Sequence, residues 1–148
     1  MRQELGFTLI ELLVTITILG VLTGMSISFF SEWKQSAGYS GAEQLMRNMQ
    51  TAAEAGLIDT DNPPAAVPLY SQNTPGVVSG AQAATLLTGL QVPKSTKMTV
   101  EYDPSCILSA CQQMFLESRH CLADEHLQVI RFGDGLELRL ANITGGGC

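Results

Sequence analysis

The sequence predicts an α+β fold in which one long N-terminal helix packs on a small antiparallel sheet. Three observations lead to this prediction. An apolar stretch covers residues 7–30. Beyond it, apolar or small residues recur every three or four positions as far as Gly56, which is the period of an amphipathic helix. The C-terminal part then carries short segments of alternating polarity around turn residues, which is typical of strands joined in hairpins.

The composition limits the classes of function. The chain has 148 residues, of which 45% are hydrophobic and only 15% are charged, and its formal net charge is -6. This length predicts a single domain, and the charged fraction is low against a typical value of about 25%. Nucleic-acid binding depends on neutralising phosphates, so an acidic chain without a cluster of Lys and Arg argues against it.

The apolar stretch is long enough to cross a membrane. As a helix it would extend about 36 Å at ~1.5 Å per residue, against a hydrocarbon core of about 30 Å. Phe29, Phe30 and Trp33 close the stretch, where an interfacial aromatic belt would lie. A buried core helix is the weaker alternative, because little chain remains to surround it. A cleaved secretory signal is also disfavoured, because its apolar core spans only ~7–15 residues and precedes a small-residue cleavage site.

Glu11 is the only charged residue between positions 7 and 30. An ionised carboxylate inside a bilayer costs several kcal/mol, and it is by default a functional residue that needs a partner. The apolar stretch contains no Lys, Arg or His. The counter-charge must therefore come from a chain terminus or from another subunit.

The residues around Glu11 supply a specific pattern. A short polar leader, residues 1–6, ends in Gly6, and the sequence Phe7-Thr8-Leu9-Ile10-Glu11 follows. This pattern resembles the type III signal of type IV pilins and of the pseudopilins of type II secretion. The resemblance implies that a prepilin peptidase cleaves between Gly6 and Phe7 and methylates the new amine of Phe7. Glu11, then the fifth residue, could pair with the Phe7 amine of a neighbouring subunit.

The resemblance continues to Gly20, a helix-softening glycine in many relatives. Those relatives often carry a proline in the second half of the membrane segment, whereas this chain has none before Pro63. Any local melting of the helix during assembly would have to begin at Gly20 or Gly24, since each glycine costs about 1 kcal/mol inside a helix.

Four segments are expected along the chain. Residues 1–6 form the leader, residues 7–30 the transmembrane and filament-core half of the helix, residues 31–56 its amphipathic half, and residues 57–148 a globular head. The helix is expected to run from about residue 8 to residue 55, and to end at Gly56 before the prolines of the next loop. The acidic spacing of Asp59 and Asp61 could hint at calcium, but without an EF-hand pattern a solvated loop is preferred, and no metal or cofactor is expected.

Within the head, residues 57–80 are expected to form a long loop, and Ser79 to cap a short helix over residues 80–90. Strands are expected at residues 97–102, 111–116, 127–132 and 136–140. The last two flank Gly133-Asp134-Gly135, a good hairpin signal.

The four cysteines lie in the last third of the chain, at Cys106, Cys111, Cys121 and Cys148. Their spacing fits a zinc site poorly, and an even number in an exported chain favours two disulfides. Four cysteines allow three pairings, which spacing does not distinguish. We favour Cys121–Cys148, which would fix the C-terminus, together with Cys106–Cys111. His120 and His126 are expected to be surface residues beside Cys121, rather than part of a Cys–His pair.

The leading hypothesis is a structural subunit of a type IV pilus. No phosphate-binding loop, serine-hydrolase elbow or zinc-protease motif is present, so the chain is not expected to be an enzyme.

The expected partners are the prepilin peptidase, other pilin subunits, the inner-membrane assembly machinery and, before assembly, the lipid bilayer. A type II secretion pseudopilin is the close alternative, and a non-polymerising, membrane-anchored periplasmic binding module is a different one. The expected location is the bacterial inner membrane, then an extracellular pilus or a periplasmic pseudopilus.

Overall fold

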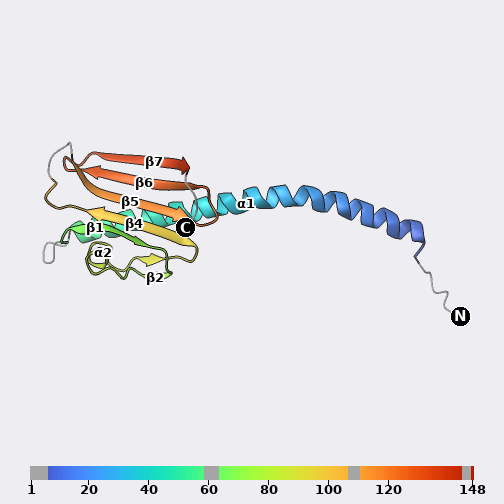
Figure 1. Ribbon diagram of the computed structural model, residues 1–148, viewed down its shortest axis with the longest axis horizontal. Coiled ribbons are helices and arrows are strands. Elements are labelled where there is room, and N and C mark those ends of the chain that lie inside the picture. The colour runs from blue at the N-terminus through green and yellow to red at the C-terminus, as the bar shows by residue number, and fades with distance from the viewer. Residues whose placement is uncertain (1–6, 59–63, 107–110, 145–147) are drawn as a thin grey trace. The chain divides into compact units, whose positions relative to one another are not determined.

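The computed structural model describes residues 7–58, 64–106, 111–144 and 148 (Figure 1). The leader with Gly6 and the acidic pair Asp59 and Asp61 lie outside the described residues. The chain divides into two compact units, Met1–Lys34 and Gln35–Cys148. Helix α1 (Leu9–Ile58) contributes to both, and the second unit adds an antiparallel sheet. The predicted α+β class is therefore confirmed.

In the second unit, α1 buries one face against the head. The buried residues follow one another at steps of one to four, mostly three or four, which keeps them on one stripe of the helix. They are Gly38, Ala42, Leu45, Met46, Met49, Ala53 and Gly56. The stripe begins at Gly38, and the preceding residue, Ala37, is exposed.

The C-terminal end of α1 differs from the prediction. The helix continues through Gly56 to Ile58 instead of ending at Gly56. A Cβ atom at position 56 would overlap the carbonyl oxygen of Leu86. The glycine is therefore required by close packing of the helix against the next segment, and it is not a stop signal.

The main sheet has five strands in the order β1-β4-β5-β6-β7, and all neighbours are antiparallel. Its strands are β1 (Val67–Gln72), β4 (Thr96–Tyr102), β5 (Gln112–His120), β6 (Glu125–Phe132) and β7 (Glu137–Thr144). Two short strands, β2 (Gly76–Val77) and β3 (Gln91–Val92), form a separate ribbon. All four expected strands are present, and β5 and β7 extend four residues beyond their expected ends.

The expectation of a loop over residues 57–80 is wrong where β1 and β2 form. Pro68 concealed β1, because proline cannot donate a hydrogen bond to a sheet. It is tolerated here because β1 is an edge strand whose pairing with β4 is irregular between Val67 and Tyr70.

Helix α2 (Ala81–Leu86) is shorter than expected, and Ser79 does not cap it. The N-cap position is Gly80, which makes no side-chain hydrogen bond. The Ser79 hydroxyl instead lies 2.9 Å from the Tyr70 hydroxyl, and its backbone N–H donates to Gln72. These contacts hold the chain that leads into α2 against β1.

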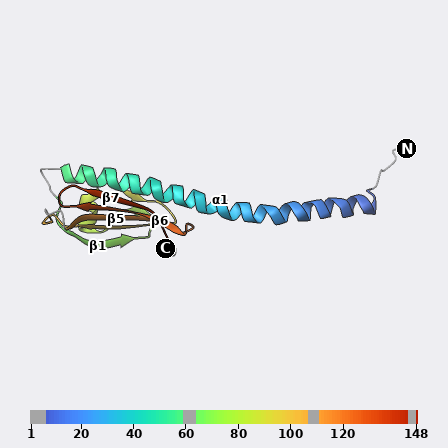
Figure 2. The same ribbon diagram turned by 90° about the horizontal axis from the view of Figure 1, so that it is seen from above.

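Residues 35–58 of α1 cover one face of the sheet (Figure 2). Leu45 and Met49 meet Met98, Val100 and Leu116 in one apolar core. In the buried part of this interface, the Ser118 hydroxyl donates a 2.7 Å hydrogen bond to the carbonyl oxygen of Ala42.

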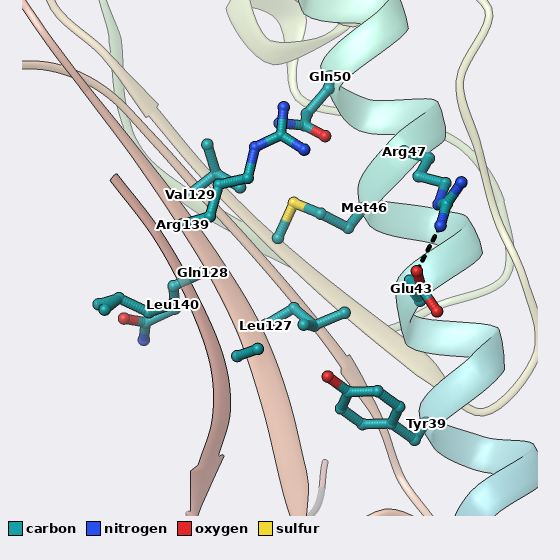
Figure 3. A pocket seen from close by; sticks show the side chains of 11 residues that line it. Tyr39, Glu43, Met46, Arg47, Gln50, Leu127, Gln128, Val129, Arg139 and Leu140 are labelled. Atoms are coloured by element: carbon teal, nitrogen blue, oxygen red, sulfur yellow. Dashed lines mark hydrogen bonds and ion pairs between the residues drawn. The ribbon is translucent and has the colours of Figure 1, made fainter. Parts of the chain in front are cut away.

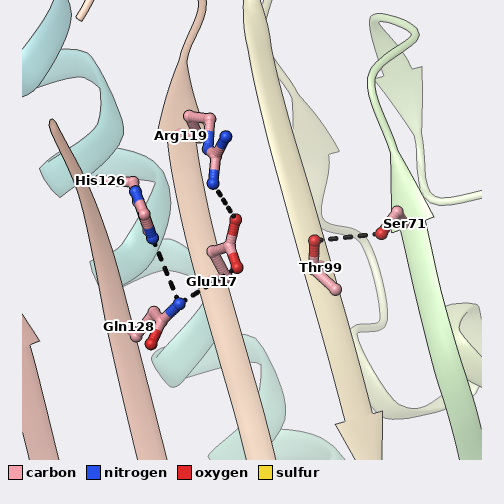
Figure 4. A network of polar contacts seen from close by, with 6 residues as sticks. All are labelled: Ser71, Thr99, Glu117, Arg119, His126 and Gln128. Atoms are coloured by element: carbon pink, nitrogen blue, oxygen red, sulfur yellow. Dashed lines mark hydrogen bonds and ion pairs between the residues drawn. The ribbon is translucent and has the colours of Figure 1, made fainter. Parts of the chain in front are cut away.

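The opposite face of the sheet carries polar side chains (Figure 4). Successive residues of a strand point to opposite faces, so Glu117 faces away from the helix that Ser118 contacts. Glu117 accepts hydrogen bonds from Arg119 at 3.2 Å and from Gln128 at 3.3 Å, and Gln128 lies 3.2 Å from His126. The expectation that His126 is a surface residue is wrong, because only 4% of it is exposed. Its burial, followed by the charge of Arg119, lowers its pKa.

Candidate functional site

Thr8 and Glu11 cap the N-terminus of α1 by hydrogen bonds to each other. The backbone N–H and the hydroxyl of Thr8 donate to one carboxylate oxygen of Glu11, at 2.9 and 2.8 Å. In return, the Glu11 N–H donates to the Thr8 hydroxyl oxygen at 3.4 Å. Thr8 precedes the first helical residue, Leu9, so this is a capping box that satisfies free backbone groups at the helix start.

Glu11 was expected from the sequence as a site residue, whereas Thr8 was not. The signal was present, since a Thr three residues before a Glu at the start of an apolar run is the capping-box pattern. The structure therefore adds Thr8 to the candidate site. It also shows that the carboxylate of Glu11 has partners within its own chain.

The apolar part of α1 is suited to a lipid environment. Its most apolar portion has a mean hydropathy of 2.1 and is not buried by any other described part of the chain. By length and composition the helix can therefore cross a membrane. Large apolar side chains on all sides of this part of the helix are exposed, for example Leu9 at 82%, and Phe7 just before the helix is 90% exposed.

Five hydroxyl groups in and just after this portion are satisfied without water. Each of the five donates a hydrogen bond of 2.7 or 2.8 Å to a backbone carbonyl three or four residues earlier, which is how polar groups are accommodated in a bilayer. The donors are Thr15, Thr17, Thr23, Ser26 and Ser31.

Aromatic residues mark the end of the first unit. The rings of Phe30 and Trp33 stack with centroids 6.1 Å apart, and the Lys34 ammonium lies 4.6 Å from the centre of the Phe30 ring. Amphipathic rings beside a cation are typical of a membrane–water interface. Phe30, Trp33 and Lys34 therefore lie where the apolar segment ends and the charged part of the helix begins.

Gly20 and Gly24 lie within α1, which passes through both without a break. A Cβ atom at either position would have no neighbour within 4 Å. No packing within the described chain therefore requires a glycine at these positions. Their role in softening the helix stays a prediction.

The four cysteines form the two disulfides that were favoured from the sequence. One disulfide joins Cys106 to Cys111, and the other joins Cys121 to Cys148. The second connects the C-terminal residue to the β5–β6 turn. Beside this turn, the Asp124 carboxylate accepts a 3.2 Å hydrogen bond from Gln35, and the His120 ring packs against Gly38.

A groove of about 450 Å³ lies between α1 and strands β6 and β7 (Figure 3). Tyr39 and Met46 point from the helix towards the strands, whereas Arg47 turns to its ion-pair partner Glu43. Across the groove, Arg139 and Gln50 both donate to Glu137, at 2.7 and 3.0 Å. Among the described residues, no group of three or more His, Cys, Asp or Glu side chains could hold a metal ion.

The comparison with known proteins identifies the N-terminal pattern. Residues 1–27 match the family described as the prokaryotic N-terminal methylation motif. This motif is the prepilin signal of type IV pilins and pseudopilins, and it includes Gly6, Phe7 and Glu11. The chain therefore carries the signal for processing by a prepilin peptidase and has the architecture of a pilin-like prepilin or pseudopilin. No curated protein matches the chain.

Proposed function

We propose that the chain is a structural subunit of a type IV pilus, cleaved between Gly6 and Phe7 and polymerised through residues 7–30. The observation that carries this proposal is the carboxylate of Glu11, held by its capping box in the first turn of α1 and the only charge in residues 7–30. A simple membrane anchor has no need of this charge, which is costly in lipid.

The proposed chemistry begins with the peptidase. Cleavage creates a cationic amine on Phe7, which is N-methylated and remains a cation. In the membrane, hydrogen bonds from Thr8 partly compensate Glu11. When the subunit enters a filament, Glu11 pairs with the Phe7 amine of a neighbouring subunit. At an effective dielectric constant near 20, charges about 4 Å apart attract by ~4 kcal/mol before desolvation.

This pair also sets the axial position of each subunit. An incorrectly docked helix would leave one of the two charges unpaired in an apolar environment, which costs more than the pair gains. The surrounding apolar side chains pack against other subunits once the helix leaves the lipid. Residues 31–56 then join this core to the head formed by residues 57–148.

A type II secretion pseudopilin would use the same processing and the same pairing. The two disulfides near the C-terminus favour the pilus, because they stabilise a head that is exposed outside the cell. A pseudopilin would instead remain in the periplasm.

Mass spectrometry of the N-terminal peptide, on a surface-sheared fraction and a membrane fraction, tests the proposal. We expect surface filaments whose subunits begin at methylated Phe7. An intact Met1 in every fraction would contradict processing and support the non-polymerising anchor. A methylated chain that never reaches the surface would support the pseudopilin.

A further inference from the structure

Strand β7 leaves one edge of the main sheet open. It pairs with β6 only, and no described strand lies along its other side (Figure 1). The opposite edge strand, β1, is protected by Pro68 and by its irregular pairing. Residues 137–144 contain neither proline nor lysine. The pairing of β7 with β6 is irregular only between Leu140 and Ile143, so residues 136–140 form a regular edge that remains open to another strand.

The side chains of this edge alternate in a self-complementary pattern. Leu136, Leu138 and Leu140 are 64%, 45% and 36% exposed, and Glu137 and Arg139 lie between them. The two charged residues share the face of the sheet that carries the groove in Figure 3. Because α1 does not fill that groove, side chains of a partner strand have room beside Arg139.

The hairpin between β6 and β7 determines which residues of β7 direct their backbone N–H and C=O groups to the open edge. The Phe132 N–H donates to the Leu136 carbonyl at 2.8 Å, which makes these two residues a hydrogen-bonded pair. In an antiparallel ladder such pairs alternate with non-hydrogen-bonded pairs. Leu138, which lies opposite Ile130, is therefore bonded to β6, whereas Glu137 and Arg139 direct their N–H and C=O groups to the open edge.

We infer that β7 pairs antiparallel with β7 of a second copy of this chain, with Leu138 opposite Leu138 of that copy. In this register, Glu137 of each copy lies opposite Arg139 of the other. Both residues direct their free backbone groups to the open edge, so each of these two pairs is hydrogen-bonded. Opposite charges directly across a ladder stabilise it, and like charges destabilise it.

Neighbouring registers are less favourable. The next hydrogen-bonded alignment in one direction places Glu137 opposite Glu137 of the second copy. The next alignment in the other direction places Arg139 opposite Arg139. Only the proposed register pairs both charges and also aligns the exposed leucines of the two copies on the other face, with Leu136 opposite Leu140.

The pairing joins chains that run in opposite directions. Subunits of one helical polymer repeat head to tail and share one direction. If the proposed function holds, the contact therefore lies between two filaments and not within one. A single edge contact is small, but many copies along two filaments would add through avidity.

Cross-linking of the full chain in detergent micelles tests the pairing without requiring polymerisation. All four native cysteines are in disulfides, so a Leu138→Cys substitution introduces one free thiol. Residues in a non-hydrogen-bonded antiparallel pair have Cα atoms about 4.5 Å apart, within the range of about 4.4–6.8 Å that a disulfide spans. We expect a disulfide-linked dimer on mild oxidation, reversed by reductant. Leu69→Cys on β1, 65% exposed, is the matched control and should remain monomeric.

The charges provide a second test. Adding Glu137→Arg to Leu138→Cys places two Arg–Arg pairs in the contact, and we expect the dimer yield at low salt to fall by about fivefold. Adding Arg139→Glu as well restores opposite charges and should restore the yield. Equal yields from the β7 and β1 cysteines, or a yield insensitive to charge reversal, would overturn the inference. Cross-links from Leu138→Cys to other proteins but not to itself would also overturn it.

Discussion

The carboxylate of Glu11 accepts hydrogen bonds from both the backbone N–H and the hydroxyl of Thr8, at 2.9 and 2.8 Å. The charge that we propose for assembly is therefore compensated in the isolated chain. Assembly then exchanges hydrogen bonds from the neutral Thr8 donors for a bond to a charged amine of a neighbour. In that bond both partners carry a charge, so Coulombic attraction is added to the hydrogen bond and favours this exchange.

Thr8→Val removes the hydroxyl and keeps the side-chain shape. We expect the helix start to lose about 1 kcal/mol of capping energy and the yield of sheared filaments to fall. Thr8→Ser, which keeps the hydroxyl, is the control and should assemble normally. The N-terminal mass of each variant separates an effect on assembly from an effect on cleavage. Full assembly of cleaved Thr8→Val would contradict a role for this hydroxyl.

Gly6→Leu tests the leader. Because the prepilin signal places a glycine before the cleaved bond, we expect this bulky residue to leave the leader attached. Gly6→Ala, the smallest change, should retain most of the cleavage. Intact-mass measurement distinguishes the two forms. Normal cleavage of Gly6→Leu would place the processing site elsewhere.

Gly56→Ala tests the packing of α1 against α2. The new methyl group would overlap the Leu86 carbonyl, and we expect a loss of about 1–3 kcal/mol in the free energy of unfolding. Gly41→Ala is the matched control, since a Cβ there comes no closer than 3.4 Å to the His120 ring. It should be neutral or stabilising by up to about 1 kcal/mol, because alanine favours a helix. Equal unfolding midpoints for the two variants would contradict this account.

Because His126 is buried, we expect the folded head to lose stability in mild acid. Burial and the charge of Arg119 hold its pKa below the ordinary value of 6.5, although Glu117 opposes this shift. The unfolded chain therefore takes up this proton more readily, and the contribution of His126, present above pH 6.5, is lost as the pH falls. We expect the wild-type melting temperature to fall between about pH 7.5 and pH 5.5.

The same melts on His126→Gln give the control, because glutamine keeps a polar contact to Gln128 and cannot titrate. Its melting temperature should fall less over this pH range. The remaining fall reports in part on His120, whose pKa is also lowered by burial. An unchanged pH dependence in His126→Gln would assign the effect to other groups.

Periodicity predicted most of the architecture because it records which side of an element is buried. The helix, the hairpin around Gly135 and the strand over β4 follow directly from such local patterns. Features set by contacts between distant segments were less predictable. Gly56 is explained by Leu86, and Pro68 is accommodated only because β1 lies at an edge. Neither fact is visible from neighbouring residues.

In the candidate site, too, features that depend on neighbouring residues were predictable and features that depend on distant contacts were not. Glu11 stands out from the sequence because it is the only charge in an apolar run, and a capping-box pattern also pointed to Thr8. The open edge of β7 could not be predicted, because the order of strands in the sheet depends on the whole topology. The same holds for His126, which is buried although its sequence neighbours are largely polar.

The proposed function depends on Glu11 as the residue that drives polymerisation after the leader is removed. The most direct measurement is the yield of sheared filaments from Glu11→Ala, together with the N-terminal mass of its subunits. We expect a chain that begins at methylated Phe7 but gives about tenfold fewer filaments or less, since losing even ~1.4 kcal/mol per contact changes an equilibrium tenfold. Wild-type yields of filaments from fully processed Glu11→Ala would contradict the account.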